Sequence, residues 1–321
     1  MWDREFAQEI FKSLLVIKGD YSNCCFKGFY KGKIYFLKKI LARPLENLQD
    51  VQERIERTEE INRQFYSQGI KTVMAVCHNG SCTHKTKEAI WVAYPWIDAE
   101  PIGLIDETLC YEVGRLLAEI HNLSITDQYF NEATKYKQPD FSWKKQITKM
   151  EDERVYPFVV ALKKLEQYTK IEHVQPKKEG LILSHGDVHV GNLLKIGKSL
   201  ILVDWELCGS IEPYAELFDT ALNMSGFCDI HTNIRFFENV VKGYFVARKG
   251  VTKQSETASV IEGVFVLLVE HICNYLNDYL SDGNIESIKK AKRFLDQFCE
   301  LKRYNKQFRL IIDQYIVENR K

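Results

Sequence analysis

Two short segments of this chain place carboxylate and carboxamide side chains at spacings that few folds can use. The first segment is Leu183-Ser-His-Gly-Asp-Val-His-Val-Gly-Asn192, and the second is Leu202-Val-Asp-Trp-Glu206. Asp187 and Asn192 are five positions apart, and Asp204 comes twelve positions after Asn192. Short apolar runs precede both segments, so we expect two buried strands that flank a polar loop. This arrangement brings the three polar side chains toward one site.

The order of these side chains suits phosphoryl transfer from a magnesium nucleotide in a protein without a Walker loop. In that chemistry one Asp orients the acceptor hydroxyl, while an Asn and a second Asp hold magnesium. The sequence therefore predicts a kinase that uses Mg²⁺ and ATP, with GTP not excluded. Asp187 is the predicted catalytic residue, and Asn192 and Asp204 are the predicted metal ligands.

Three motifs together resemble the aminoglycoside phosphotransferase and choline kinase superfamily, the kinases of small-molecule hydroxyls. His185-Gly-Asp187 stands where a protein kinase has His-Arg-Asp, and Asp204-Trp-Glu206 stands where it has Asp-Phe-Gly. Gly114-Arg-Leu-Leu-Ala-Glu-Ile-His121 is similar to the Gly-x-x-Leu-Ala-x-x-His helix of that superfamily. The resemblance extends over about residues 18–225.

The resemblance implies an α+β, protein-kinase-like bilobal fold. A small β-rich N-terminal lobe would span residues 1–95, and a larger, mainly helical C-terminal lobe would span residues 96–321. Apolar periodicity and β-branched content agree, because they predict a strand over 34–40, a helix over 46–68 and a helix over 105–122. Further strands are expected at 71–77 and 88–94, and further helices at 141–150, 156–168 and 260–276.

The same resemblance assigns nucleotide contacts to the first lobe. Lys38 occupies the position of the family lysine that pairs with the α- and β-phosphates, and Lys39 points to the opposite face because side chains alternate along a strand. Of four glutamates on the following helix, Glu59 falls closest to the apolar stripe, so we expect it to form an ion pair with Lys38. Ser22 lies in the loop that would cover the phosphates, although a plain surface hairpin is an equal alternative.

Ala93-Tyr-Pro-Trp-Ile-Asp98 resembles the hinge that receives the adenine base. Pro95 has no amide hydrogen. The predicted adenine contacts are therefore the carbonyl of Pro95 and the amide of Ile97. A purely rigid linker role for Pro95 is the alternative.

The acceptor is less constrained by the sequence. Family members bind amino sugars, choline-like amines, ribose derivatives and amino alcohols through acidic and aromatic side chains, which makes Glu206 and Glu216 candidate substrate ligands. Glu216 belongs to Glu212-Pro-Tyr-Ala-Glu216-Leu, which is similar to a family stretch that often has a structural role. Residues 1–95 are mildly basic and the remainder is mildly acidic, which suits an anionic donor and a cationic acceptor.

We therefore expect a small cationic acceptor, with an aminoglycoside-type antibiotic favoured and antibiotic resistance as the role. A metabolic kinase of choline, a methylthioribose-like sugar or an amino alcohol is the main alternative. A non-catalytic pseudokinase that binds a partner is the third possibility.

Composition limits the partners and the location. The 44 basic side chains balance the 44 acidic ones, so no global field attracts nucleic acid or an anionic membrane. Nine cysteines without a regular framework indicate a reducing compartment. The charged N-terminus lacks the apolar core of a signal peptide, and no apolar run approaches about 18 residues. We expect a cytoplasmic monomer or dimer without a membrane or nucleic-acid partner.

Cys77-His78 and Cys82-Thr-His84 invite a zinc interpretation. However, Asn79-Gly80 lies between the two pairs, and this dipeptide favours a tight hairpin turn. An ordinary hairpin is the preferred prediction for this stretch.

Overall fold

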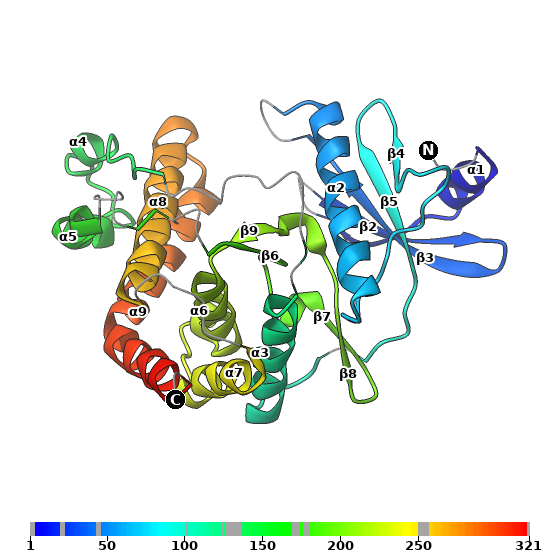
Figure 1. Ribbon diagram of the computed structural model, residues 1–321. Helices are drawn as coiled ribbons and strands as arrows, with labels where there is room; N and C mark the ends of the chain where they lie inside the picture. Colours follow the sequence, from blue (N-terminus) through cyan, green and yellow to red (C-terminus); the bar gives the residue numbers. More distant parts are fainter. Residues whose placement is uncertain are drawn as a thin grey trace. The chain divides into compact units, whose positions relative to one another are not determined.

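The computed structural model forms two compact units, with the elements labelled in Figure 1. It describes residues 4–19, 23–42, 46–100, 102–123, 125, 137–168, 174–175, 180–249 and 257–319. The first unit comprises 1–103, 123–128 and 184–209, and the second comprises 104–122, 129–183 and 210–321. The segment 184–209, which carries the predicted catalytic residues, folds with the N-terminal part of the chain. The predicted division into 1–95 and 96–321 did not anticipate this.

The first unit is built on an antiparallel sheet with the strand order β1-β2-β3-β5-β4. Helix α1 (Arg4–Lys12) covers one face of the sheet, where Phe6 and Ile10 pack with Leu37 and Trp91. Helix α2 (Leu48–Ser67) covers the other face. The strands are β1 (Leu15–Gly19), β2 (Asn23–Tyr30), β3 (Lys33–Ile40), β4 (Thr83–Lys85) and β5 (Ile90–Pro95).

The register of β3 decides which face each of its lysines occupies. Lys38 pairs with Val92, whose side chain belongs to the core under α2. Lys39 faces the α1 side, where its Nζ lies 5.8 Å from the centre of the Trp91 ring. The predicted opposite orientation of the two lysines is confirmed.

Helix α2 begins and ends where its capping residues predict. The Asn47 side chain accepts hydrogen bonds from the amides of Gln49 and Asp50, at 2.9 and 3.0 Å. Gly69, just past the end of the helix, has a φ of +96°, a conformation that glycine adopts without strain. Its apolar stripe is buried at Val51, Ile55, Ile61 and Phe65, whereas Tyr66 is half exposed.

The predicted strand over 71–77 is wrong. Within the described residues this segment forms only isolated contacts: Thr72 bridges to Leu202, and the Val76 amide donates to the Ala93 carbonyl at 2.8 Å. The segment instead connects the sheet to the strand that precedes Asp204.

The hairpin predicted at Asn79-Gly80 is present, and both residues have positive φ angles of 51° and 82°. Cys77 and Cys82 form a disulfide across this turn. The disulfide corrects the expectation that the cysteines remain reduced. No group of three or more His, Cys, Asp or Glu side chains able to hold a metal occurs among the described residues, so the zinc alternative has no support.

Short elements near the catalytic segments complete the first unit. They are the 3-10 turn η2 (Val190–Asn192), the hairpin strands β7 (Leu193–Ile196) and β8 (Ser199–Leu202), and the 3-10 turn η3 (Trp205–Leu207). Strand β6 (Ile182–Ser184) precedes this segment in the sequence and β9 (Gly209–Ile211) follows it, and the two strands pair with each other. The prediction of short strands flanking a polar loop is confirmed.

The second unit is helical, and α3 and α7 cross closely within it. An added Cβ on Gly114 of α3 would lie 2.0 Å from the Val240 carbonyl oxygen, and one on Gly243 of α7 would lie 2.0 Å from that of Tyr111. Only glycine permits this approach. The elements are α3 (Glu107–His121), α4 (Lys144–Ile147), α5 (Tyr156–Leu165), η1 (Glu166–Tyr168), α6 (Pro213–Met224), η4 (Phe227–Asp229), α7 (Ile234–Ala247), α8 (Thr257–Asp282) and α9 (Ile285–Glu318).

Helix α8 is long and apolar enough to cross a membrane by length and composition alone. Residues such as Val269, Ile272 and Leu276 are buried within the unit, and 56% of the most apolar window is covered. This burial is what a core helix of a helical unit requires. Helix α9 is amphipathic, with Leu295 and Phe298 buried.

Candidate active site

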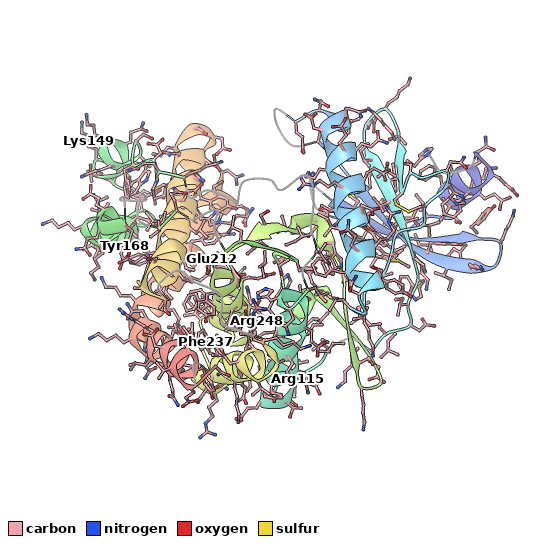
Figure 2. The ribbon with its side chains drawn as sticks, viewed as in Figure 1. Arg115, Lys149, Tyr168, Glu212, Phe237 and Arg248 are labelled. Atoms are coloured by element: carbon pink, nitrogen blue, oxygen red, sulfur yellow. A yellow bond between two sulfur atoms is a disulfide. The ribbon has the colours of Figure 1, made fainter. Side chains whose placement is uncertain are left out.

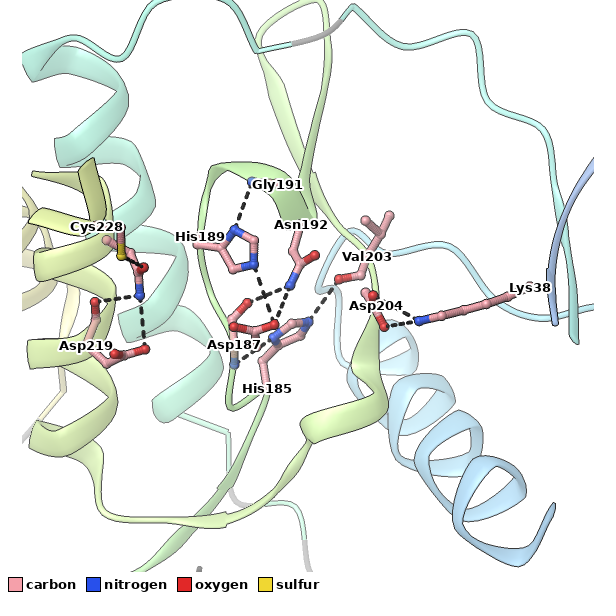
Figure 3. Close-up of polar contacts among 11 residues, drawn as sticks. Lys38, His185, Asp187, His189, Gly191, Asn192, Val203, Asp204, Asp219 and Cys228 are labelled. Carbon is pink, nitrogen blue, oxygen red and sulfur yellow. Dashed lines mark hydrogen bonds and ion pairs between the residues drawn. The ribbon is translucent and has the colours of Figure 1, made fainter. Parts of the chain in front are cut away.

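The predicted catalytic residue and one predicted metal ligand are joined directly (Figure 3). The Nδ2 atom of Asn192 donates to the Asp187 carboxylate oxygen Oδ2 and to the Asp187 carbonyl, both at 2.9 Å. Both contacts use Nδ2, which leaves the amide oxygen of Asn192 as the atom that a metal could bind. The five-residue spacing therefore closes a compact loop whose carboxylate and carboxamide share one hydrogen bond.

The Asp187 carboxylate is held in its charged form. Burial works against the charge, but the neighbouring His189 side chain and the Asn192 amide outweigh burial and lower the pKa of Asp187. An ionised carboxylate with a low pKa accepts a hydrogen bond well and removes a proton poorly. This suits alignment of a hydroxyl in a transition state that does not require early deprotonation.

His185 ties the loop at Asp187 to the strand that leads to Asp204. Its ring is fully buried, its Nδ1 accepts the Asp187 amide at 3.2 Å, and its Nε2 lies 3.1 Å from the Val203 carbonyl. The amide must donate to Nδ1, so the proton of the neutral ring is on Nε2 and is donated to that carbonyl. These contacts make His185 a structural residue of the loop.

Asp204 has an unusual backbone conformation, and the packing of the next residue, Trp205, holds it in place. Its φ of +66° lies in the left-handed region, which is uncommon for a residue other than glycine. Trp205 is buried, donates from its ring nitrogen to the Thr72 hydroxyl at 2.7 Å, and packs on Phe65 with ring centroids 4.8 Å apart. Because the Trp205 side chain is anchored, the positions of Asp204 and Glu206, on either side of it in the sequence, are also restricted.

Lys38 meets both of these carboxylates. Its Nζ lies 3.0 and 3.1 Å from the two Asp204 oxygens and 2.7 Å from Glu206 Oε1. Burial opposes the charge on the lysine, but the two carboxylates outweigh burial and raise the pKa of Lys38. The side chain is therefore a cation throughout the neutral range, held directly at the predicted metal ligand.

The predicted ion pair between Lys38 and Glu59 is wrong. Within the described chain, Glu59 is buried and accepts from the Tyr94 hydroxyl at 2.5 Å and from the Ala75 amide at 3.2 Å. Burial raises the pKa of Glu59. The helical wheel placed Glu59 on the correct face, but the neighbouring strand β5 supplies its partner.

Glu206 takes the position expected for Glu59. The sequence assigned Glu206 to the acceptor, whereas its described ion pair is with Lys38. The spacing in Asp204-Trp-Glu206 could have predicted this ion pair. The buried Trp205 lies between two carboxylates, so both of them can approach one cation.

The predicted hinge residues lie at the end of β5. The Trp96 amide donates to the Ile34 carbonyl at 3.0 Å, so the peptide groups of Pro95 face away from β3. The Ala93 carbonyl, which faces the same way, accepts the Val76 amide. Ile97 follows the strand, and its carbonyl accepts the Ala99 amide at 3.0 Å. Ser22, the predicted phosphate contact, lies outside the described residues.

Glu216 is not a surface ligand in the second unit. It is buried, and its Oε2 lies 2.8 Å from His121 Nε2, while His121 Nδ1 lies 2.9 Å from the Tyr244 hydroxyl. The acceptor role predicted for Glu216 is therefore corrected to an internal polar network. This network explains the His at the end of the Gly114–His121 motif.

Glu212 begins α6, where its carboxylate accepts the Ala215 amide at 2.6 Å (Figure 2). Arg248, which follows α7, donates to the carbonyl of His121 at 2.7 Å and so caps the end of α3 (Figure 2). The stretch from Glu212 to Glu216 is thus a helix cap followed by a buried contact.

His189 also lies near the predicted catalytic carboxylate, with its Nε2 3.5 Å from Asp187 Oδ2. The sequence gave it no role beyond the loop. The sequence signal for this contact is the position of His189 two residues after Asp187, because a turn after Asp187 can bring the His189 side chain back toward the carboxylate.

Comparison with solved structures shows a shared kinase-like fold. The chain is 17% identical to a spectinomycin phosphotransferase crystallised with ADP and spectinomycin, with a TM-score of 0.64 over 89% of this chain and 92% of that one. It is 15% identical to an amicoumacin kinase in complex with AMP-PNP and Ca²⁺, with a TM-score of 0.60 over 94% of each chain. A choline kinase from Cryptosporidium parvum is 14% identical, with a TM-score of 0.54 over 97% of this chain and 94% of that one.

No curated protein matches this chain. A family model described as the phosphotransferase enzyme family matches residues 17–251, which include the complete constellation from Lys38 to Glu206. With its α+β kinase-like fold and this match over most of its length, the chain belongs to the phosphotransferase enzyme family and is a small-molecule kinase.

Proposed function

We propose that this protein transfers the γ-phosphoryl group of ATP to a hydroxyl of a small cationic molecule, with an aminoglycoside-type antibiotic as the favoured acceptor. The observation that carries the proposal is a pair of contacts within one folded unit: Asn192 donates to Asp187, and Lys38 donates to Asp204. His185 connects the two pairs, because it contacts the Asp187 amide and the carbonyl of Val203, next to Asp204. Each of the four groups has a distinct task in phosphoryl transfer, and all four are held by hydrogen bonds or ion pairs.

In the proposed reaction the acceptor oxygen forms the new bond to the γ-phosphorus. The bond between that phosphorus and the β–γ bridging oxygen breaks, and ADP leaves with the electron pair. Asp187 accepts a hydrogen bond from the hydroxyl and takes its proton as the new bond forms. Alignment by Asp187 is the larger contribution, because positioning and charge stabilisation dominate this chemistry.

The side chains fit a magnesium ion bound together with phosphates. Mg²⁺ prefers oxygen ligands and is usually held by one or two protein carboxylates plus substrate phosphates and water. Asp204 supplies a carboxylate and Asn192 its amide oxygen, so a larger cluster of protein ligands is not needed. When bound, the metal neutralises charge on the transferred group.

Nucleotide binding is assigned to the first unit. Lys38 would exchange its contact with Asp204 for the α- and β-phosphates, while Glu206 keeps it in place. The Pro95 carbonyl and the Ile97 amide remain the proposed adenine contacts, with ATP preferred and GTP not excluded. Ser22 remains a proposed phosphate contact.

The acceptor proposal rests on chemistry shared by similar proteins. The similar structures include a spectinomycin phosphotransferase, an amicoumacin kinase and a choline kinase. Their names support a small molecule as the acceptor. The choline kinase supports the second candidate, a metabolic kinase of choline, an amino alcohol or a methylthioribose-like sugar. The intact set of four groups argues against a non-catalytic pseudokinase.

A panel of acceptors in a coupled ADP-release assay tests the proposal. Spectinomycin, an aminoglycoside, amicoumacin, choline and a neutral sugar are compared at saturating magnesium ATP, with Asp204→Ala as the control. We expect at least one cationic acceptor to stimulate ADP release, and Asp204→Ala to abolish it with the fold intact. Wild-type turnover in Asp204→Ala would sink the assignment.

A further inference from the structure

His189 places an imidazole ring directly beside the proposed catalytic carboxylate (Figure 3). Its Nδ1 accepts the backbone amide of Gly191 at 3.0 Å, which makes His189 the N-cap of η2. Because Nδ1 is the acceptor, the proton of the neutral ring sits on Nε2. That nitrogen faces Asp187 Oδ2 at 3.5 Å.

The contacts on Asp187 are asymmetric. Asn192 Nδ2 reaches Oδ2 at 2.9 Å, and His189 Nε2 approaches the same oxygen. Among the described residues, these two side-chain contacts of the carboxylate both fall on Oδ2. The hydrogen bond from Asn192 and the longer approach of His189 lie on the same oxygen, so both favour one rotation of the carboxylate, with Oδ1 on the opposite side.

Gly191 has a specific steric reason to be glycine. An added Cβ would lie 2.7 Å from His189 Cε1 and 3.0 Å from His189 Nδ1. Contacts under 3.0 Å essentially never occur for a real Cβ, so the ring would have to move. The glycine therefore provides the space in which the His189 ring lies against the loop.

We propose that His189 is a positioning residue: with Asn192 it holds Asp187 Oδ2, so that Oδ1 is presented to the acceptor hydroxyl. This inference rests on the proposed phosphoryl transfer. His189 itself does not touch the reactants, and its effect passes through Asp187. The low pKa of Asp187 agrees with a donor at this place.

A capping role alone is the competing explanation, and one substitution separates the two. His189→Asn keeps an N-cap side chain for the Gly191 amide, since Asn is among the best N-caps. Its shorter side chain cannot reach Asp187. We expect kcat to fall roughly 10- to 100-fold, the loss typical of a misplaced catalytic group. The Kd for ATP and the Tm should stay near the wild-type values.

Gly191→Ala provides an independent route to the same defect, because it displaces the ring without changing it. Gly103→Ala is the matched control, since an added Cβ there meets nothing within 4 Å. We expect Gly191→Ala to lower kcat as His189→Asn does, and Gly103→Ala to behave as wild type.

The deciding experiment is a double-mutant cycle with Asp187→Asn. Single-turnover ADP formation is measured with magnesium ATP and the best acceptor of the panel, or with water alone as acceptor. If His189 acts through Asp187, adding His189→Asn to Asp187→Asn should change the rate by less than about 2-fold. Additive losses, or a wild-type kcat in His189→Asn, would overturn the inference. If Asp187→Asn alone had no effect, the proposed function would fail instead.

Discussion

The resting position of Lys38 is the most informative feature at the scale of single residues. A buried lysine normally loses charge, but here two carboxylates hold the ammonium group at 2.7 to 3.1 Å. One of them, Asp204, is the proposed metal ligand, and the other, Glu206, is not needed for the metal. Glu206 is therefore free to keep the lysine in place when the nucleotide and metal engage Asp204.

This division of roles predicts different outcomes for two glutamates. Glu206→Gln removes a charged partner from Lys38, so we expect the KM for ATP to rise roughly 10-fold, the value of one charge-assisted hydrogen bond. Glu59→Gln should leave that KM within about 2-fold and lower the Tm, because Glu59 bonds to Tyr94 and Ala75 inside the core. Steady-state kinetics and thermal unfolding of both variants check this. The reverse pattern would restore Glu59 as the partner of Lys38.

At the scale of elements, one carboxylate of α2 accepts several hydrogen bonds from the disulfide hairpin. Glu56 accepts the amides of Cys82 and Thr83 at 3.0 Å and the hydroxyls of Ser81 and Thr83 at 2.5 and 2.6 Å. Burial raises the pKa of Glu56, but these hydrogen bonds, led by the Cys82 amide, outweigh burial and lower it below 4.5. A group with a lowered pKa stabilises the fold above its unfolded value, and this contribution is lost as the pH falls through its folded value.

Glu56→Gln should therefore lower the free energy of unfolding by about 1–3 kcal/mol at neutral pH. The difference from wild type should shrink below the ordinary Glu pKa of 4.5, where the wild-type carboxyl becomes protonated. Glu60→Gln is the control, because its exposed ion pair with Arg63 is worth less than about 1 kcal/mol. Urea unfolding at both pH values measures this. Equal losses for the two variants, or a loss independent of pH, would contradict the role of Glu56.

The elements also show which features the sequence could predict. Asp187, Asn192 and Asp204 were identified because their spacing is local and the chemistry needs that order. Helix α2 was bounded correctly because its cap and its final glycine lie next to its ends. The partners of Glu59 and Glu206 were missed because they depend on how α2, β5 and η3 pack.

The errors share the same cause. The segment 71–77 has strand-like composition, but its hydrogen bonds go to single residues of other elements. Cys77 and Cys82 were treated as unpaired because the spacing of the cysteines did not indicate a disulfide. Glu216 was predicted as a candidate substrate ligand, although tertiary packing buries it against His121.

At the scale of the whole molecule, the chain has no net charge, so long-range attraction of an acceptor must come from local carboxylates. If the acceptor is cationic, its KM should rise with ionic strength more steeply than the KM of a neutral analogue with the same hydroxyl, because salt screens exposed charges. Initial rates at increasing potassium chloride concentrations measure this. A neutral or anionic best acceptor with a salt-independent KM would favour the metabolic alternative.

The central claim is that Asp187 orients the acceptor while other residues bind the nucleotide. The most direct test is the single-turnover rate of phosphoryl transfer in Asp187→Asn, measured together with its Kd for magnesium ATP. We predict a rate reduced by roughly 100-fold or more, with the Kd unchanged within a few-fold. A wild-type rate, or a loss of nucleotide binding with the rate preserved at saturation, would contradict the account.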